Sequence, residues 1–209
     1  MQVTIALAKG RLAEKTLKIL KRCGIAPDDM EEDSRKLIYF DEANDIRFLM
    51  VKPSDVPTYV DHGIADIGVA GRDTLLESEL SLYEMLDLKF GACKMCVAGY
   101  PEMEKRITAS VLRVATKFPE TAKKYYAARG ETIEVIKLNG SVELAPMLGL
   151  ADVIMDLVES GRTLKENGLV VLEEVCDISA RLAVNRVSLK TKAGAITPLL
   201  EKIRSVLED

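Results

Sequence analysis

The chain has 209 residues, a net charge of −4 and a pI of about 5.3. The acidic balance argues against a nucleic-acid-binding protein, which usually carries a basic face, and the absence of Trp argues against a stacking platform for single strands. No apolar run approaches the roughly 20 residues of a membrane span. No basic segment precedes the first apolar run, so we expect a first strand there and no signal peptide.

Predicted strands and helices alternate along the first half of the chain. In order, they are a strand at 3–8, a helix at 11–23, strands at 36–40 and 46–51, a helix at 53–61, a strand at 64–70, a short helix at 72–77, and strands at 82–88 and 92–98. The helix at 11–23 carries an apolar stripe and ends at Gly24 with Pro27 beyond, as helices usually end.

A second alternating series fills the rest of the chain. It comprises a strand at 111–115, a helix at 119–129, a strand at 132–138, a helix that begins near Ser141, a strand at 153–156, a short helix at 163–167, a strand at 169–175 and an amphipathic helix at 190–207. Pro198 inside the last helix predicts a kink or a split there. The alternation predicts an α/β fold with mostly parallel sheets.

One phrase recurs in the two series, Gly63-Ile-Ala-Asp66-Ile and Gly149-Leu-Ala-Asp152-Val. Each copy precedes a strand and then a Gly-containing turn into a helix. The repeat favours two related half-folds, as in a two-lobed periplasmic-binding-protein-like fold with a central cleft, and chance similarity is the alternative. With no flexible linker visible, we expect the chain to cross between the lobes as strands near 89–92 and 176–179.

The segment most indicative of a binding site follows the apolar run Val153-Ile-Met155. We expect a buried strand here that delivers Asp156 to its carboxyl edge. The turn Ser160-Gly161-Arg162-Thr163 then leads into a helix and offers a phosphate free N–H groups, small hydroxyls and the positive end of a helix dipole. On this segment alone, an ordinary strand–turn–helix with a Ser/Gly N-cap is an equally good interpretation.

Three further segments carry candidate site residues. Lys9-Gly10-Arg11 follows the first strand and suits a polyphosphate, although a solvated basic turn is the commoner meaning of such a sequence. The segment 139–146 is a glycine turn into a helix, with Ser141 as a possible N-cap and Glu143 in the first turn, where its charge suits the dipole. Lys52 ends a strand and is expected at the edge of the cleft.

Cysteine and histidine usage argues against metal-binding and nucleophilic sites. Cys93 and Cys96 lie three apart in a predicted strand and would face opposite sides, so they would not converge on a metal. With Cys23 and Cys176 they are expected to be reduced, structural thiols of a cytoplasmic protein. His62 is the single histidine and lies at a predicted helix end, which argues against Ser-His or Cys-His catalysis.

Taken together, these segments resemble ATP phosphoribosyltransferase, the first enzyme of histidine biosynthesis, in its short form. The family signature is met, with its spacing intact, by Glu143, Gly149, Ala151, Asp156, Ser160, Gly161, Thr163 and Leu164. Six further segments resemble family segments and occur in the family order, so that the likeness covers essentially the whole chain. They are KGRL, DVPTYV, GIADIG, GRDTLLE, ATKFP and GSVELAP. Many relatives carry Arg where this chain has Lys52. Lysine keeps the positive charge but cannot bind an anion through two parallel N–H groups as arginine does.

The resemblance implies a reaction between two substrates, each of which is bound by one of two lobes. Adenine N1 of ATP would displace pyrophosphate from C1 of phosphoribosyl pyrophosphate. One lobe, 1–91 plus 177–209, would face ATP, and the other, 92–176, would face phosphoribosyl pyrophosphate. The resemblance places catalytic roles on Asp156 and Glu143, the phosphoribosyl pyrophosphate on Glu159, Ser160, Gly161, Arg162, Thr163 and Leu164, and ATP near Lys9, Gly10, Arg11, Lys52 and Asp73.

The same resemblance implies a metal and a partner. Adenine N1 needs no general base, so the chemistry requires carboxylates near a cationic C1, and Mg²⁺ that arrives on the substrate's pyrophosphate. The chain stops where long-form relatives continue into a regulatory domain, so we expect a homodimer that works with a subunit resembling histidyl-tRNA synthetase, four copies of each in a hetero-octamer. The rivals are a non-catalytic two-lobed solute-binding module and a phosphoribosyltransferase for another base.

Overall fold

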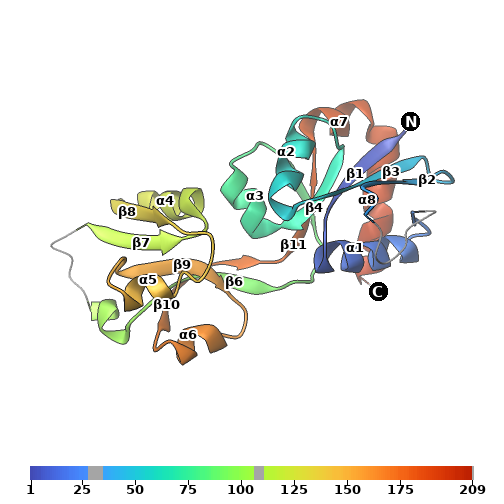
Figure 1. Cartoon of the computed structure of the whole chain (residues 1–209). Coiled ribbons are helices and arrows are strands. Elements are labelled where there is room, and N and C mark those ends of the chain that lie inside the picture. The colour runs from blue at the N-terminus through green and yellow to red at the C-terminus, as the bar shows by residue number, and fades with distance from the viewer. Residues whose placement is uncertain (28–34, 106–110, 209) are drawn as a thin grey trace. The chain divides into compact units, whose positions relative to one another are not determined.

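The computed structural model describes residues 1–27, 35–105 and 111–208, and the chain divides into two compact units (Figure 1). The first unit is Met1–Gly91 with Ser179–Asp209, and the second is Ala92–Ile178. The units meet at residues 91–92 and 178–179, compared with the expected boundaries at 91–92 and 176–177. The strand expected near 89–92 is absent, because β5 ends at Asp87 and β6 begins only at Cys93. Within the described ranges, none of the helices has the length and apolar character that a membrane span requires.

The first unit is built on a mixed sheet with strand order β2-β3-β1-β4-β11-β5. Its strands are β1 (Val3–Ala8), β2 (Ile38–Asp41), β3 (Ile46–Val51), β4 (Ile67–Gly71), β5 (Tyr83–Asp87) and β11 (Ala180–Val184). β1 lies parallel to both β3 and β4, while β2 and β11 run antiparallel to their neighbours. The carboxyl ends of β3, β1 and β4 therefore meet at one edge of the sheet.

Helices cover both faces of this sheet. They are α1 (Arg11–Arg22), η1 (Pro53–Asp55), α2 (Val56–Asp61), α3 (Arg72–Ser78), α7 (Arg186–Thr191) and α8 (Ala193–Glu208). Ile5 and Leu7 of β1 pack in one core with α1 and α8, whereas Ala6 and Ala8 pack in another with α2. Because successive side chains of a strand point to opposite faces, α1 and α8 lie on one face of the sheet and α2 on the other (Figure 1).

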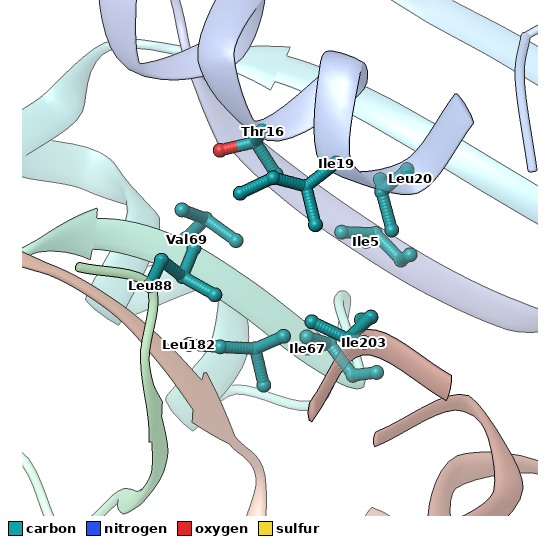
Figure 2. A pocket seen from close by; sticks show the side chains of 9 residues that line it. All are labelled: Ile5, Thr16, Ile19, Leu20, Ile67, Val69, Leu88, Leu182 and Ile203. Atoms are coloured by element: carbon teal, nitrogen blue, oxygen red, sulfur yellow. The ribbon is translucent and has the colours of Figure 1, made fainter. Parts of the chain in front are cut away.

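The core beneath α1 and α8 contains a small apolar hollow of about 10 Å³. Figure 2 shows the side chains that surround it, which come from α1, α8, the strands β1, β4 and β11, and Leu88. Its one polar neighbour, Thr16, already donates its hydroxyl to the Leu12 carbonyl at 2.7 Å. A space of this size without polar partners is expected to be dry, so it is a packing gap.

The second unit has strand order β10-β6-β9-β7-β8. Its elements are β6 (Cys93–Gly99), η2 (Pro101–Lys105), β7 (Leu112–Thr116), α4 (Pro119–Ala128), β8 (Ile133–Lys137), α5 (Leu144–Met147), β9 (Val153–Val158), α6 (Arg162–Glu166) and β10 (Val170–Ile178). β7 lies parallel to β8 and β9, and β6 runs antiparallel to β9 and β10. Val142, Ala145 and Leu164 join Ile154 in a core on one face, and α4 lies on the other (Figure 1).

The recurring phrase marks a shared structural role at the amino end of a strand. Asp66 accepts a hydrogen bond from Thr4 N at 2.8 Å, and Asp66 N donates to Thr4 O at 2.8 Å. Asp152 and Arg113 make the same reciprocal pair, at 3.0 and 2.9 Å. The likeness ends at the later turns, because Gly71 is extended at φ −66° whereas Gly161 is left-handed at φ 69°.

The largest departures from the sequence predictions lie in the last 30 residues or so of the chain. β11 and the first four residues of α7 fall where no element was predicted, and the break between helices is at Lys192 and not at Pro198, which lies inside α8. α7 begins at Arg186 because the Asn185 side chain accepts hydrogen bonds from Val187 N and Ser188 N as its N-cap. Pro198 is the sixth residue of α8, beyond the first turn, so the helix continues through it without a hydrogen bond to the Gly194 carbonyl.

Candidate active site

A hollow of about 220 Å³ in the second unit brings together candidates that are far apart in sequence. It is lined by Glu143, by Ile154, and by the continuous segment 156–164. The predicted carboxylates and the predicted phosphate turn therefore border one space, which is the arrangement that a sugar phosphate requires.

Asp156 lies inside β9 and not at its end, so this detail of the prediction is wrong. The strand continues to Val158 because β6 keeps pairing with it as far as Val158, opposite Lys94. The parallel pairing with β7, however, stops at Met155. Asp156 is thus the first residue past the parallel ladder, half-buried, with its Oδ1 accepting a hydrogen bond from Leu157 N at 2.8 Å.

The turn after β9 has the backbone form that the sequence predicts. Gly161 has φ 69° and ψ 3°, a left-handed conformation, and serves as the N-cap of α6. The Ser160 hydroxyl accepts a hydrogen bond from Arg162 N at 3.4 Å. Because α6 has only five residues, its dipole is small. An anion at this turn would therefore be held mainly by the backbone N–H groups of the turn.

The side chains of the turn divide into exposed and anchoring ones. Those of Glu159, Ser160, Arg162 and Thr163 are exposed. The guanidinium of Arg162 is directed along the helix to Glu166, with Nε 2.8 Å from Oε1. Leu164 is buried in the core, so its side chain anchors the turn and only its backbone can face a ligand.

Glu143 reaches the hollow from the turn between β8 and α5. α5 begins at Leu144, so Glu143 is its N-cap residue, without a side-chain cap hydrogen bond, and the predicted N-cap Ser141 lies outside the helix. Ser141 has φ 48°, and its carbonyl accepts from Leu144 N at 3.1 Å, which makes it part of a preceding turn. Pro146 is then the third helical residue, a position that needs no amide hydrogen.

Lys117 is a cation at this edge that sequence reasoning did not single out. It follows β7 directly and is exposed. β7 lies between β8 and β9, so Lys117 leaves the sheet between the turn that holds Glu143 and the segment that holds Asp156. Its place just after the predicted strand at 111–115 was the signal that could have identified it.

The candidates for ATP lie at the carboxyl edge of the first unit's sheet. Lys9, Gly10 and Arg11 follow β1, and Lys52 follows β3, whose last residue Val51 is paired with Ala8. Lys9 N donates to Val51 O at 2.9 Å, so that the two segments are tied together. All four residues are exposed, and Gly10, at φ 94° and ψ −153°, has a backbone conformation that only glycine adopts readily.

Asp73 lies at the same edge, in the first turn of α3 after β4. Its carboxylate folds back over Gly71, where a Cβ would clash with Oδ1. The Thr74 hydroxyl donates to Oδ2 at 3.5 Å. Asp73 therefore interacts with the start of its own helix, and its contact with ATP stays a prediction.

One cysteine lies on the strand next to Asp156, in a setting that disfavours the thiolate. Cys96 of β6 is paired with Asp156 across the sheet and is buried. Burial raises the pKa of its thiol, and the Glu174 carboxylate raises it further. Cys23, Cys93 and Cys176 likewise form no disulfide, and the described residues contain no group of three or more His, Cys, Asp or Glu side chains that could hold a metal ion.

Comparison with known proteins identifies the family of this chain. A model of the ATP phosphoribosyltransferase (HisG) family matches residues 52–205, most of the chain. The ATP phosphoribosyltransferase of Caldanaerobacter subterraneus subsp. tengcongensis is 54% identical over 205 residues, which cover 98% of this chain and 97% of that protein. A chain of the ATP phosphoribosyl transferase (HisG:HisZ) complex from Thermotoga maritima is 40% identical, with a TM-score of 0.84 and coverage of 99% and 98%.

A more distant structure bears on the fold alone. The VFT2 domain of Bordetella pertussis BvgS is 13% identical, with a TM-score of 0.56 over 99% of this chain and 91% of that one. The predicted α/β, two-lobed, periplasmic-binding-protein-like fold class is thereby confirmed, while the cleft stays a prediction. The family model and the close relatives go further, and together they show that this chain belongs to the ATP phosphoribosyltransferase (HisG) family.

Proposed function

We propose that the hollow of the second unit binds phosphoribosyl pyrophosphate and that the cationic edge of the first unit binds ATP. The observation that carries the proposal is that Glu143, Asp156 and the Gly161 turn line one space. The chain is an ATP phosphoribosyltransferase, which acts in the first step of histidine biosynthesis. The bond from adenine N1 to ribose C1 forms while the bond from C1 to pyrophosphate breaks, giving N1-(5-phosphoribosyl)-ATP and pyrophosphate.

The proposed roles follow from where charge develops in this reaction. Adenine N1 carries a lone pair at neutral pH, so it attacks without a general base, and the absence of histidine from the hollow is no obstacle. C1 becomes cationic as pyrophosphate leaves, so Asp156 and Glu143 stabilise it by their negative charge. The N–H groups of the turn hold the 5′-phosphate and thereby fix the sugar against these carboxylates.

Mg²⁺ fits this site as a metal carried by the substrate. The described residues offer no three-ligand group, so a cage made only of protein side chains is not available there. Two carboxylates beside a pyrophosphate suit Mg²⁺, which binds few protein ligands and keeps several waters. Asp156 and Glu143 would hold it, and when bound it would neutralise charge on the departing pyrophosphate.

The proposal extends to a regulatory partner. The related Thermotoga maritima chain was solved as an ATP phosphoribosyl transferase (HisG:HisZ) complex, and the present chain spans 98% of it. This supports a second subunit, and the resemblance to short-form enzymes indicates one similar to histidyl-tRNA synthetase. A hetero-octamer with four copies of each chain is part of the same proposal. None of the four cysteines forms a disulfide, which supports a reducing, cytoplasmic location.

A direct assay separates this function from its rivals. The protein, with the synthetase-like subunit present, is mixed with ATP and phosphoribosyl pyrophosphate, and both pyrophosphate release and the change in adenine absorbance are followed. The proposal expects both signals together and neither when ATP is omitted. Pyrophosphate release with another base but not with ATP would indicate a different phosphoribosyltransferase. Tight binding of phosphoribosyl pyrophosphate without release would indicate a binding module.

A further inference from the structure

We propose that Thr116 is a positioning residue that sets the direction of Asp156 in the catalytic step. The inference rests on the proposed function, because it assigns Thr116 to act through a carboxylate of that site. Thr116 is the last residue of β7, and its exposure is 0%. It cannot touch a substrate, so any influence on the reaction must pass through the groups that it holds.

The hydroxyl of Thr116 joins two segments at the edge of the sheet. It donates to the Met155 carbonyl at 2.6 Å and accepts from Phe118 N at 2.8 Å. The backbone carbonyl of Thr116 in turn accepts from Leu138 N at 2.9 Å, at the start of the segment that leads to Glu143. Thr116 is therefore hydrogen-bonded to Met155, the residue before Asp156, and to Leu138, in the segment that leads to Glu143.

The Thr116 hydroxyl replaces a missing rung of the parallel ladder. The pairing of β7 with β9 ends at Thr116 and Met155, and beyond it α4 begins at Pro119. The Met155 carbonyl belongs to the peptide that links Met155 to Asp156, so a hydrogen bond to that oxygen fixes the plane from which Asp156 departs. Without the hydroxyl, this peptide would be held only by the pairing of β9 with β6, and the carboxylate would shift with any tilt of the peptide.

The chemistry demands a side chain that both donates and accepts at this point. Phe118 N–H donates to the hydroxyl, and the hydroxyl donates onward to Met155 O. Serine can do the same, whereas valine has the shape of threonine and neither function. A shift of about 1 Å in a reacting group can lower a rate by about 100-fold, so loss of the hydroxyl is expected to lower turnover clearly.

The test compares Thr116→Val and Thr116→Ser, each made in the wild-type chain and in Asp156→Asn. Turnover number and KM for phosphoribosyl pyrophosphate are measured with the synthetase-like subunit present. We expect Thr116→Val to lower kcat by about tenfold or more with a small change in KM, and Thr116→Ser to stay within about twofold of wild type. In the Asp156→Asn background, where the charge to be positioned is gone, Thr116→Val should change kcat by less than about twofold.

Three outcomes would overturn the inference: wild-type turnover in a folded Thr116→Val, equal losses from Val and Ser, or the same loss in both backgrounds. The last would show an effect that does not pass through Asp156. If Thr116→Val does not fold, as thermal melting would show, Thr116→Ala and Thr116→Ser replace it and differ in the hydroxyl alone. Failure of the proposed function is separate, because it would appear as no activity in the wild-type complex or full activity in Asp156→Asn.

Discussion

Gly161 shows how one residue without a side chain can determine an anion site. Its left-handed backbone turns the chain from β9 into α6, and a Cβ at this position would have Val158 Cγ1 as its nearest neighbour, at 3.9 Å. The interior thus has room for a side chain on the protein side, so the need for glycine comes from the backbone conformation and from close approach of a ligand. Gly130, after α4, has a similar φ of 73° with nothing within 4 Å of its Cβ position.

This pair of glycines allows a matched experiment. We expect Gly161→Val to abolish binding of phosphoribosyl pyrophosphate, because a side chain would keep the phosphate away from the turn. Gly130→Val carries a comparable backbone strain of about 1–3 kcal/mol but lies outside the lining of the hollow, so it should bind normally. Calorimetry on both variants, after melting curves confirm folding, is the measurement. Near-wild-type affinity in Gly161→Val would remove the turn from the site.

Asp156 is expected to act mainly in the transition state. Asp156→Asn keeps the shape of the side chain and removes its charge, which matters most when C1 is cationic. We predict a fall in kcat on the order of 100-fold with ATP affinity changed by less than about threefold. Glu143→Gln should behave in the same direction, and Asp177→Asn on β10, outside the hollow lining, is the control. Weaker binding with unchanged kcat would make Asp156 a substrate-positioning residue instead.

Residue-level prediction from sequence succeeded where a local pattern decides the structure. The Gly161 turn needs only a glycine between a strand and a short helix. The sequence shows the glycine, the apolar run of the strand and the helix-forming residues that follow. Ser141 failed as an N-cap because the chain makes a turn at φ 48° first, which buried Val142 holds against the core. Leu164 belongs to the family signature, and only the fold shows that its side chain is a core anchor.

At the scale of elements, strands and helices that depend on local sequence are predicted correctly, whereas those that depend on distant residues are missed. β1 and β3 have the predicted bounds because each is a compact apolar run. β11 escaped prediction because it is a five-residue strand whose identity comes from its antiparallel neighbours β4 and β5, which are far away in sequence. α7 escaped because its start depends on the Asn185 cap, which looks like a loop residue in the sequence.

Asn185 is expected to be a major stabilising residue of the first unit. It is 7% exposed, and besides capping α7 it donates its amide to Val60 O at 2.7 Å and to Asp61 O at 3.1 Å. Asn185→Ala should lower the free energy of unfolding by about 2 kcal/mol, since a cap and buried hydrogen bonds are lost together. Asn167→Ala, which removes one exposed hydrogen bond to Thr163 O, should lower it by under about 0.5 kcal/mol. Urea unfolding of both variants is the test, and equal effects would contradict it.

The contact between α4 and β10 predicts a pH dependence of stability. Burial alone would raise the pKa of Glu173, but hydrogen bonds from the Tyr125 hydroxyl and Arg129, and the charge of Arg129, outweigh it and lower the pKa below 4.5. Because the folded-state pKa is the lower one, this carboxylate stabilises the protein above about pH 4.5, and that contribution is lost as pH falls through the folded value. Melting temperature should therefore fall less steeply in acid for Glu173→Gln than for wild type. Glu174→Gln on the same strand is the control, and parallel acid profiles for Glu173→Gln and wild type would refute the assignment.

At the scale of the whole molecule, each unit presents its candidate residues at the carboxyl edge of its own parallel strands. In the first unit these strands are β3, β1 and β4, and in the second they are β8, β7 and β9. Ligands of open α/β sheets bind at such edges, because loops there can differ without disturbing the core. Both sheets also begin in the same way. An Asp before one strand bonds the backbone of the neighbouring strand, Asp66 with Thr4 in the first unit and Asp152 with Arg113 in the second. Alternation in the sequence predicts an α/β fold, but the expectation of mostly parallel sheets is wrong, because β2, β5, β6, β10 and β11 pair antiparallel. Alternation also does not show which loops meet in one hollow.

The last prediction concerns regulation by a partner. We expect the isolated chain to form a homodimer with little activity and no response to histidine, and the synthetase-like subunit to raise activity and confer histidine inhibition. The reason is that the related Thermotoga maritima chain, of nearly the same span, was solved with a second protein, HisZ. Histidine can inhibit only if it binds one state of the complex better than another, so the partner must change which state the catalytic chain adopts.

Light scattering gives the size of the isolated and mixed chains, and the pyrophosphate assay gives their activity with and without histidine. A complex with four copies of each chain is the expected mass. The coupling must be reciprocal for binding, so substrates should change histidine affinity by the same factor by which histidine changes theirs. Isothermal calorimetry on the complex measures both factors. Full activity together with histidine inhibition in the isolated chain would refute this account, because regulation would then reside in the catalytic chain itself.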